Sequence, residues 1–164
     1  TEIEKYPELL AQIYKEGHAI GNHTYSHKYK EIYRSPETYI SQLKKNDDVI
    51  MNVLHVRPRI TRAPGGPTGS FNKYYWSQLK ENGYIDICWN ISSGDASGLN
   101  AAEIVTNTAR QLKENQFLWS HSIVLMHDGT GHAETVKALP SIIKMYKDQG
   151  FEFQIVNIET PPAW

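Results

Sequence analysis

The sequence predicts an α/β fold with largely parallel strands, in a sheet that is either open or curled into a barrel. The chain has 164 residues, which is within the roughly 100–200 residues usual for one domain, so residues 1–164 are expected to form a single domain. Hydrophobic residues make up 40% of the chain and charged residues 21%, as in ordinary globular proteins. Short apolar runs alternate with amphipathic helical segments along the whole length, and this is the order of strand–helix units.

The first elements are marked by helix-starting and helix-breaking residues. Pro7 suits the first turn of a helix, and the apolar face that follows it ends at Gly17. Ser35 and Pro36 mark a second start, with the Ser as N-cap and the Pro at the first helical position, and Pro58 stops that helix. The expected order is a helix over 7–17, a strand over 18–23, a helix from 36 to the stop at 58 and a strand over 59–62.

The same alternation continues through the rest of the chain. Gly83 is expected as a left-handed helix cap, Asn100 as an N-cap, and Gly150 as the end of the last helix. The run that follows Gly83 has few polar interruptions, as is typical of strands covered on both faces. The expected elements are helices over 72–81, 101–113 and 133–147, which alternate with strands over 84–91, 122–126 and 151–156.

Composition excludes several classes of function. Seventeen basic residues stand against eighteen acidic ones, so the basic excess that drives binding to nucleic-acid phosphates is missing and no nucleic-acid partner is expected. No apolar stretch approaches the 18 residues of a membrane span. The single cysteine, Cys88, lies in an apolar run and is expected to be a small buried hydrophobic residue. Function must therefore be sought in the polar side chains.

Polar clusters follow four of the expected strands. His23 and His27 follow the first strand, Arg62 the second, Asp95 the third and His127 the fourth. In α/β folds the active residues lie at the carboxyl ends of parallel strands. We therefore expect these clusters to meet at one rim. The remaining histidines are expected to have structural roles: His18, His55, His121 and His132.

Each cluster has a catalytic and a structural interpretation. His23 and His27 can bind zinc, cobalt, nickel or iron together with a carboxylate, or they can be two loop histidines, since a catalytic zinc usually has three protein ligands. The Gly-rich loop after Arg62 can donate backbone N–H groups to an oxyanion, or it can be a surface turn. Asp95 can hold a histidine in one tautomer or cap its own turn, and His127 can be a general acid or a core residue.

In this order, the clusters resemble the polysaccharide deacetylases of carbohydrate esterase family four, also called the NodB homology domain. The sequence HTYSH at residues 23–27 matches the second motif of that family, RAPGG at 62–66 the third, and LMH at 125–127 the fifth. The resemblance spans nearly the whole chain. It implies a distorted, incomplete (β/α) barrel of largely parallel strands.

Two family motifs are altered or missing. The fourth, Asp-x-x-Asp-Trp, keeps Asp95 but has Ser92 and Ala96 in place of the first Asp and the Trp. The first, Thr-Phe-Asp-Asp, supplies a general base and a carboxylate ligand in the family and has no counterpart before His23. We therefore expect a domain truncated at its N-terminus, whose missing strand–helix–strand is either absent or supplied by a separate chain. The chain alone is expected to be inactive.

The resemblance implies metal-dependent hydrolysis of N-acetyl groups on a GlcNAc-containing polysaccharide, such as peptidoglycan or a chitin-like polymer. It places the activity outside the cell or at the cell envelope. His23 and His27 would bind a divalent metal, with Zn2+ favoured and Co2+, Ni2+ or Fe2+ as alternatives. The base would be a carboxylate of the missing segment.

The same resemblance implies roles for five further residues. His127 would protonate the leaving amine, Asp95 would tune it, and Arg62 would orient the base. The backbone N–H of Gly65 would hold the oxyanion, and Leu125 would line the acetyl pocket.

Two other functions are weighed against deacetylation. One is a non-catalytic glycan-binding protein that kept the groove, which the altered Ser92 and Ala96 favour. The retained histidines and Arg62 disfavour it, because a binding groove needs neither metal ligands nor an acid. The other is an unrelated metal-dependent amidohydrolase, and this would need further His or Asp ligands at other strand ends.

Overall fold

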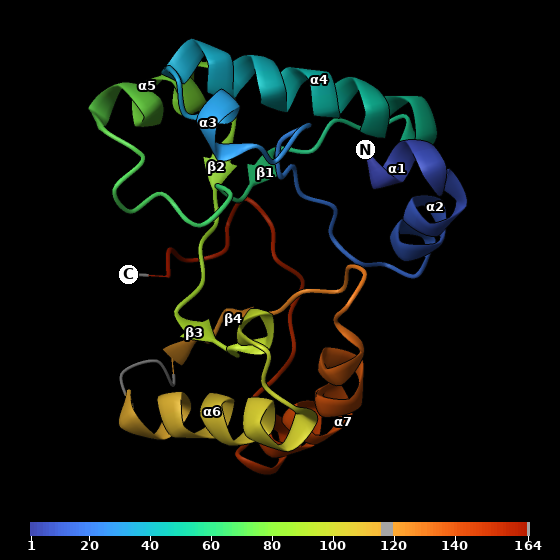
Figure 1. The fold of residues 1–164 in the computed structure, drawn as a ribbon, viewed down its shortest axis with the longest axis vertical. Helices are drawn as coiled ribbons and strands as arrows, with labels where there is room; N and C mark the ends of the chain where they lie inside the picture. Colours follow the sequence, from blue (N-terminus) through green and yellow to red (C-terminus); the bar gives the residue numbers. More distant parts are fainter. Residues whose placement is uncertain (116–119, 164) are drawn as a thin grey trace. The chain divides into compact units, whose positions relative to one another are not determined.

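The computed structural model describes residues 1–115 and 120–163, and these form two compact units (Figure 1). The first unit comprises residues 1–88 with 155–160, and the second comprises residues 89–154 with 161–163.

The first unit is built around one long helix. Its elements are α1 (Glu2–Lys5), α2 (Pro7–Lys15), α3 (Tyr29–Ile32), α4 (Pro36–Leu54), β1 (Ile60–Thr61), α5 (Lys73–Glu81) and β2 (Ile85–Asp86). Strands β1 and β2 pair in parallel, with Ile60 opposite Ile85. Helices α4 and α5 lie on one side of this pair (Figure 1). Side chains from α3, α4 and α5, together with Tyr84, form the core of this unit. The core residues are Ile32, Tyr39, Ile40, Leu43, Tyr75, Leu79 and Tyr84.

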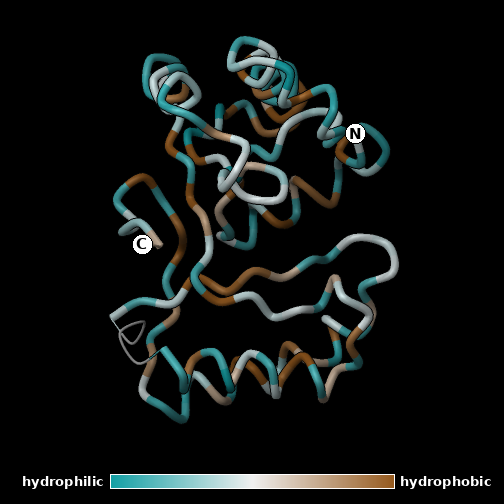
Figure 2. Tube along the Cα trace, turned by 60° about the vertical axis from the view of Figure 1, so that its left-hand side comes forward, coloured by the Kyte–Doolittle hydropathy of each residue, from teal (hydrophilic) through white to brown (hydrophobic). Residues whose placement is uncertain are grey.

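The second unit packs two helices against a short parallel pair. Its elements are β3 (Ile91–Ser92), the 3-10 turn η1 (Asp95–Ser97), α6 (Ala101–Glu114), β4 (Val124–Leu125) and α7 (Ala133–Asp148). Ile91 lies opposite Val124, and Ser92 lies opposite Leu125. The core residues are Ile91, Ile104, Leu112, Ala138, Ile142 and Tyr146. Figure 2 shows apolar and polar residues interspersed along the helices, and among the described residues no helix is both long and apolar enough to cross a membrane.

The predicted helices are confirmed, with Ser35 and Asn100 as N-caps, although α4 ends at Leu54, ahead of the stop expected at Pro58. Ser35 Oγ accepts a hydrogen bond from the N–H of Thr38 at 3.2 Å at the start of α4. Asn100 and Glu103 form a reciprocal capping box on α6. Such caps satisfy backbone N–H groups that have no partner within the helix.

The predicted strands are only partly confirmed. The pairing is parallel as expected, but the strand over 18–23 is reduced to a single bridge between Asn22 and Thr61. The strand over 84–91 is divided into β2 and β3, because its backbone changes partner. Ile87 donates to Thr61 O, whereas Asn90 donates to Ile123 O.

The prediction of a fifth strand over 151–156 is wrong, because no strand is formed there. The alternation of helices with strands predicted a strand here, but Phe153 is 57% exposed and Ile155 is 58% exposed. No described segment pairs with this stretch as a neighbouring strand. The single domain over residues 1–164 stays a prediction.

Candidate active site

In the first unit, His23 and His27 lie on the loop that follows the Asn22 bridge. His23 Nδ1 is 2.5 Å from the carbonyl oxygen of Arg62. Because a carbonyl can only accept, Nδ1 carries the proton and Nε2 holds the lone pair that a cation would use. The ring of His27 lies with its centroid 5.0 Å from that of His23, at 61°. The structure thus brings together His23, His27 and the backbone of Arg62.

The loop that carries these histidines has an unusual backbone. Thr24 and His27 have φ values of 69° and 55°, in the left-handed region that residues other than glycine rarely adopt. Asn22 Oδ1 accepts from the N–H of Thr24 at 2.9 Å, and Gln42 on α4 accepts from the N–H of Ser26 at 2.9 Å. Such conformations persist where the surroundings fix them. These side-chain bonds therefore help to hold the histidine loop in place.

Asn22 is itself held by a buried polar network. Its amide donates to the carbonyl of Leu43 at 2.8 Å and to Asp47 Oδ1 at 2.6 Å. The other oxygen of Asp47 accepts from Arg57 Nε at 2.8 Å and from the hydroxyl of Tyr84 at 2.7 Å. A buried carboxylate is tolerated when its lone pairs are satisfied in this way. The network therefore connects the histidine loop to α4 and to the start of β2.

The third-motif loop requires a glycine at position 65. Gly65 is exposed and has a φ of +74°. A Cβ at this position would lie 2.7 Å from the hydroxyl oxygen of Tyr29, so a side chain here would have a strained backbone and would require Tyr29 to shift. The neighbouring Pro64 is fixed because Tyr33 donates to its carbonyl at 2.6 Å.

Asp86 is a candidate residue that sequence analysis missed. Burial raises the pKa of this carboxyl to about 6, against the opposing effects of a hydrogen bond from Cys88 and the attraction of Arg62. The Cys88 thiol lies 3.2 Å from Oδ2. Oδ1 is buried without a hydrogen-bond partner among the described residues. In the sequence, the feature that could have identified Asp86 is its place as the one acidic residue within an apolar strand.

In the second unit, Asp95 and His127 form a hydrogen-bonded pair. His127 Nδ1 lies 2.9 Å from Asp95 Oδ1, and the backbone N–H of His127 donates to Oδ2 at 2.6 Å. Thr135 also donates to Oδ2, at 2.9 Å. Burial acts to raise the pKa of Asp95, but the hydrogen bonds from His127 and Thr135 outweigh it, and the pKa is below its ordinary value. A carboxylate can only accept, so His127 carries a proton on Nδ1.

In the altered fourth motif, the backbone of Ser92 is hydrogen-bonded to a side chain of α6. Gln111 on α6 accepts from the N–H of Ser92 at 3.0 Å and donates to its carbonyl at 2.6 Å. Ala96 is exposed, where the family has a Trp. Leu125, the predicted acetyl-pocket residue, is half-buried on β4 opposite Ser92.

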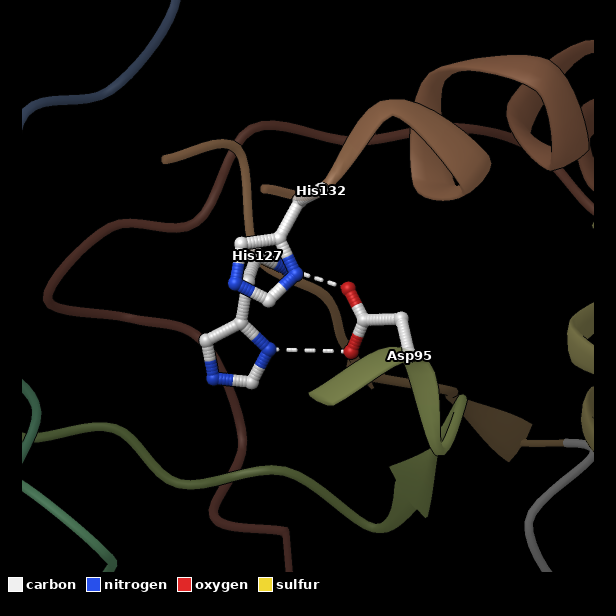
Figure 3. Close-up of side chains that lie close together, drawn as sticks. All are labelled: Asp95, His127 and His132. Atoms are coloured by element: carbon white, nitrogen blue, oxygen red, sulfur yellow. Dashed lines mark hydrogen bonds and ion pairs between the residues drawn. The ribbon is translucent and has the colours of Figure 1, made fainter. Parts of the chain in front are cut away.

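His132, which was expected to be structural, lies beside the Asp95–His127 pair. Its ring stacks on that of His127, with the centroids 5.2 Å apart and the planes at 22° (Figure 3). Asp95, His127 and His132 each offer a ligand atom within 4.8 Å of the others, and they are the only such group of three among residues 1–115 and 120–163. In the sequence, the feature that could have identified His132 is the short turn that separates it from His127.

Comparison with known proteins decides the family. The sequence profile of the family described as "Polysaccharide deacetylase" matches residues 1–86, which is more than half of the chain. The chain belongs to the polysaccharide deacetylase family. This confirms the resemblance noted from the motifs.

Individual family members give further comparisons with this polysaccharide deacetylase chain. It is 28% identical over 166 residues to a peptidoglycan-N-acetylglucosamine deacetylase from Bacillus cereus, covering 98% of this chain and 58% of that protein. The crystal structure of the catalytic domain of a peptidoglycan N-acetylglucosamine deacetylase from Eubacterium rectale matches with a TM-score of 0.83 and 27% identity, over 98% of this chain and 74% of that one. This likeness confirms the predicted fold class, a distorted, incomplete (β/α) barrel.

A third comparison concerns the fold. A family-four pseudoenzyme from Bacillus anthracis has the same fold, with a TM-score of 0.74 and 22% identity over 92% of this chain and 49% of that one. The present polysaccharide deacetylase chain spans little more than half the length of the first curated relatives that it matches.

Proposed function

We propose that this protein hydrolyses N-acetyl groups on a GlcNAc-containing polysaccharide at the cell envelope or outside the cell, with peptidoglycan as the first candidate. The hydrogen-bonded pair of Asp95 and His127 carries this proposal, because it is the arrangement that a general acid requires. The relatives described as peptidoglycan deacetylases support the choice of polymer.

The histidine loop of the first unit fits a divalent cation, with Zn2+ favoured. His23 bonds to a carbonyl through Nδ1, which leaves Nε2 as the unprotonated nitrogen that a metal ligand needs, and His27 lies beside it. A bound metal would polarise the acetyl carbonyl and acidify a water molecule. No carboxylate completes a group of three with His23 and His27 among the described residues. By the family's first motif, the third ligand and the base would be carboxylates from outside residues 1–164, which Arg62 would help to orient.

The second unit would handle the proton of the leaving amine. With Nδ1 bonded to Asp95, the Nε2 atom of a protonated His127 is the one that can donate to the amine. Three hydrogen bonds to the Asp95 carboxylate fix the orientation of this pair. They come from the ring of His127, the backbone N–H of His127 and the hydroxyl of Thr135. His127 would thus hold its proton in a defined position before transfer.

The two remaining roles concern the acetyl group. The exposed backbone of Gly65, which has no side chain to shield it, would donate its N–H to the developing oxyanion. Leu125 on β4 would line the pocket for the methyl group. Both roles are carried over from the matching motif positions.

The deciding experiment measures acetate released from N-acetylated chito-oligosaccharides and from peptidoglycan in the presence of Zn2+. Residues 1–164 alone should release almost none, whereas the natural polypeptide that contains them should turn over. Robust release by the isolated chain would refute the assignment of base and third ligand to another segment. No release by the natural polypeptide on either substrate would refute the function itself.

The second candidate is a glycan-binding protein without catalysis. It is favoured by Ser92 and Ala96, which replace two residues of the fourth motif, and catalysis has been lost in at least one protein of this fold, the Bacillus anthracis pseudoenzyme. In that case the natural polypeptide would bind chito-oligosaccharides in a calorimetric titration but would release no acetate from them.

A further inference from the structure

The Asp95, His127 and His132 cluster has the dimensions of a cation site. Two ligands at 2.0–2.1 Å from a tetrahedral zinc lie about 3.3 Å apart. His127 Nδ1 and Asp95 Oδ1 are already 2.9 Å apart, and all three ligand atoms lie within 4.8 Å of one another. His132 would need to move by about 1.5 Å at most to complete this geometry. Figure 3 shows both rings on the same side of the Asp95 carboxylate.

His132 is free to make such a movement. It is the residue before α7, and its backbone is held by bonds to Gly129 and Thr135. Among the described residues, its ring stacks on that of His127, and only its backbone forms hydrogen bonds. The ring is half-buried. Rotation about its side-chain bonds would therefore cost no hydrogen bond with any of those residues.

The charge of the cluster also favours a cation. The side chain of Asp95 is only 2% exposed, and its hydrogen bonds stabilise the ionised form. A buried carboxylate is costly unless it is paired, and a divalent cation bound between Asp95 and the two imidazoles would supply the opposite charge. Carboxylate and imidazole are both ligands for zinc.

We propose that Asp95, His127 and His132 form a second divalent-cation site, suited to Zn2+, that is distinct from the His23 and His27 pair and inhibits the enzyme when occupied. The inhibitory part rests on the function proposed above. The cation would take the position of the proton between His127 Nδ1 and Asp95 Oδ1, and that proton would move to Nε2 through solvent. A neutral, metal-bound imidazole is a far weaker acid than an imidazolium, so His127 could no longer protonate the leaving amine. Low zinc would then support activity, and excess zinc would suppress it.

The binding test does not depend on catalysis. In the His23→Ala/His27→Ala double variant, a Co2+ titration followed by visible absorption, with Zn2+ displacement, should still show one bound equivalent. Adding His132→Ala should weaken this binding by at least tenfold, because loss of even an outer partner of a metal ligand costs roughly 10–100-fold. His121→Ala is the matched control, since its ring bonds to the carbonyl of Pro162 at 2.9 Å in the same unit, and it should leave binding unchanged.

Two outcomes would overturn the proposal. One is the absence of any bound equivalent in the double variant. The other is equal affinity with and without His132, in protein whose amide NMR spectrum shows that it is folded. A loss of affinity in His121→Ala equal to that in His132→Ala would also count against the assignment.

The activity test uses the natural polypeptide. His132→Ala should keep the basal rate of acetate release and lose the inhibition by excess Zn2+ that the wild type shows. Equal inhibition of both proteins would refute the inhibitory role. If neither protein releases acetate at any zinc concentration, the proposed function fails, and the Co2+ titration still decides whether the second site exists.

Discussion

Both units of the chain hold a histidine ring by its Nδ1 atom, but they use different acceptors. His23 bonds to the neutral backbone carbonyl of Arg62, and His127 bonds to the buried carboxylate of Asp95. A carbonyl fixes the tautomer and leaves a neutral ring that suits a metal ligand. A carboxylate can also balance the charge of an imidazolium, which suits proton transfer. The group that accepts the Nδ1 hydrogen bond therefore distinguishes a metal-binding histidine from a general acid more clearly than the sequence around each ring does.

The largest expected effect tests this division directly. His127→Ala in the natural polypeptide should lower kcat about 10²–10⁴-fold, the range that a general acid contributes, and should leave metal bound by the His23 and His27 pair. His23→Ala should instead abolish that metal binding. Acetate release and metal content after dialysis measure the two effects, and His121→Ala serves as the control for both. Loss of the metal in His127→Ala, or its retention in His23→Ala, would show that the roles are not divided in this way.

The second prediction compares a carboxylate from each unit. Burial raises the pKa of Asp86 to about 6, whereas hydrogen bonds bring that of Asp95 below its ordinary value despite burial. Because the folded-state pKa of Asp86 lies above the unfolded value, its contribution to stability is present at about pH 4 and lost as the pH rises to about 6. For Asp95 the sign is opposite, and its contribution is lost as the pH falls below about 4.

Denaturant unfolding at several pH values measures this contrast. From pH 4 to 7, the free energy of unfolding of Asp86→Asn should rise relative to wild type by about 2 kcal/mol, since one pKa unit corresponds to about 1.4 kcal/mol and the unfolded carboxyl is already about half ionised at pH 4. Asp95→Asn should show no such rise over that interval. A difference between Asp86→Asn and wild type that does not change with pH would contradict the assigned direction.

The third prediction concerns the network beneath the histidine loop. Asp47→Ala removes the acceptor of Asn22, Arg57 and Tyr84 and should lower the free energy of unfolding by about 1–3 kcal/mol, the cost of leaving buried donors unpaired. Asp148→Ala removes the exposed partner of Lys144 and should change it by less than about 1 kcal/mol. Urea titration compares the two variants, and equal losses would show that the network does not stabilise the first unit.

The elements that could be predicted from the sequence are those fixed by neighbouring residues. The starts of α4 and α6 follow from Ser35 and Asn100, whose side chains bond to the first turn of their own helix. The strand over 151–156 was predicted wrongly because a strand depends on a partner that is distant in sequence, and alternation alone does not supply one. The same physical reason explains why β2 and β3 were expected to be one strand.

The site shows the same limit. The Asp95 and His127 pair, 32 residues apart, was anticipated because motifs in a known order brought the two residues into one hypothesis. Asp86 and His132 were missed because their importance comes from tertiary contacts. Burial gives Asp86 its raised pKa, and the turn after His127 stacks His132 on that ring.

The smallest expected effect is a difference in stability between alanine substitutions at two glycines of the first unit. Gly65→Ala and Gly69→Ala both place a side chain at positive φ, 74° and 76°, which should cost about 1 kcal/mol each. Only at Gly65 would the new Cβ also meet the Tyr29 hydroxyl, at 2.7 Å, whereas Gly69 has nothing within 4 Å. Gly65→Ala should therefore be the less stable variant in urea titration. Adding Tyr29→Ala should recover that difference, because contacting residues couple in a double-mutant cycle, and additivity of the two changes would show that Tyr29 does not restrict the loop.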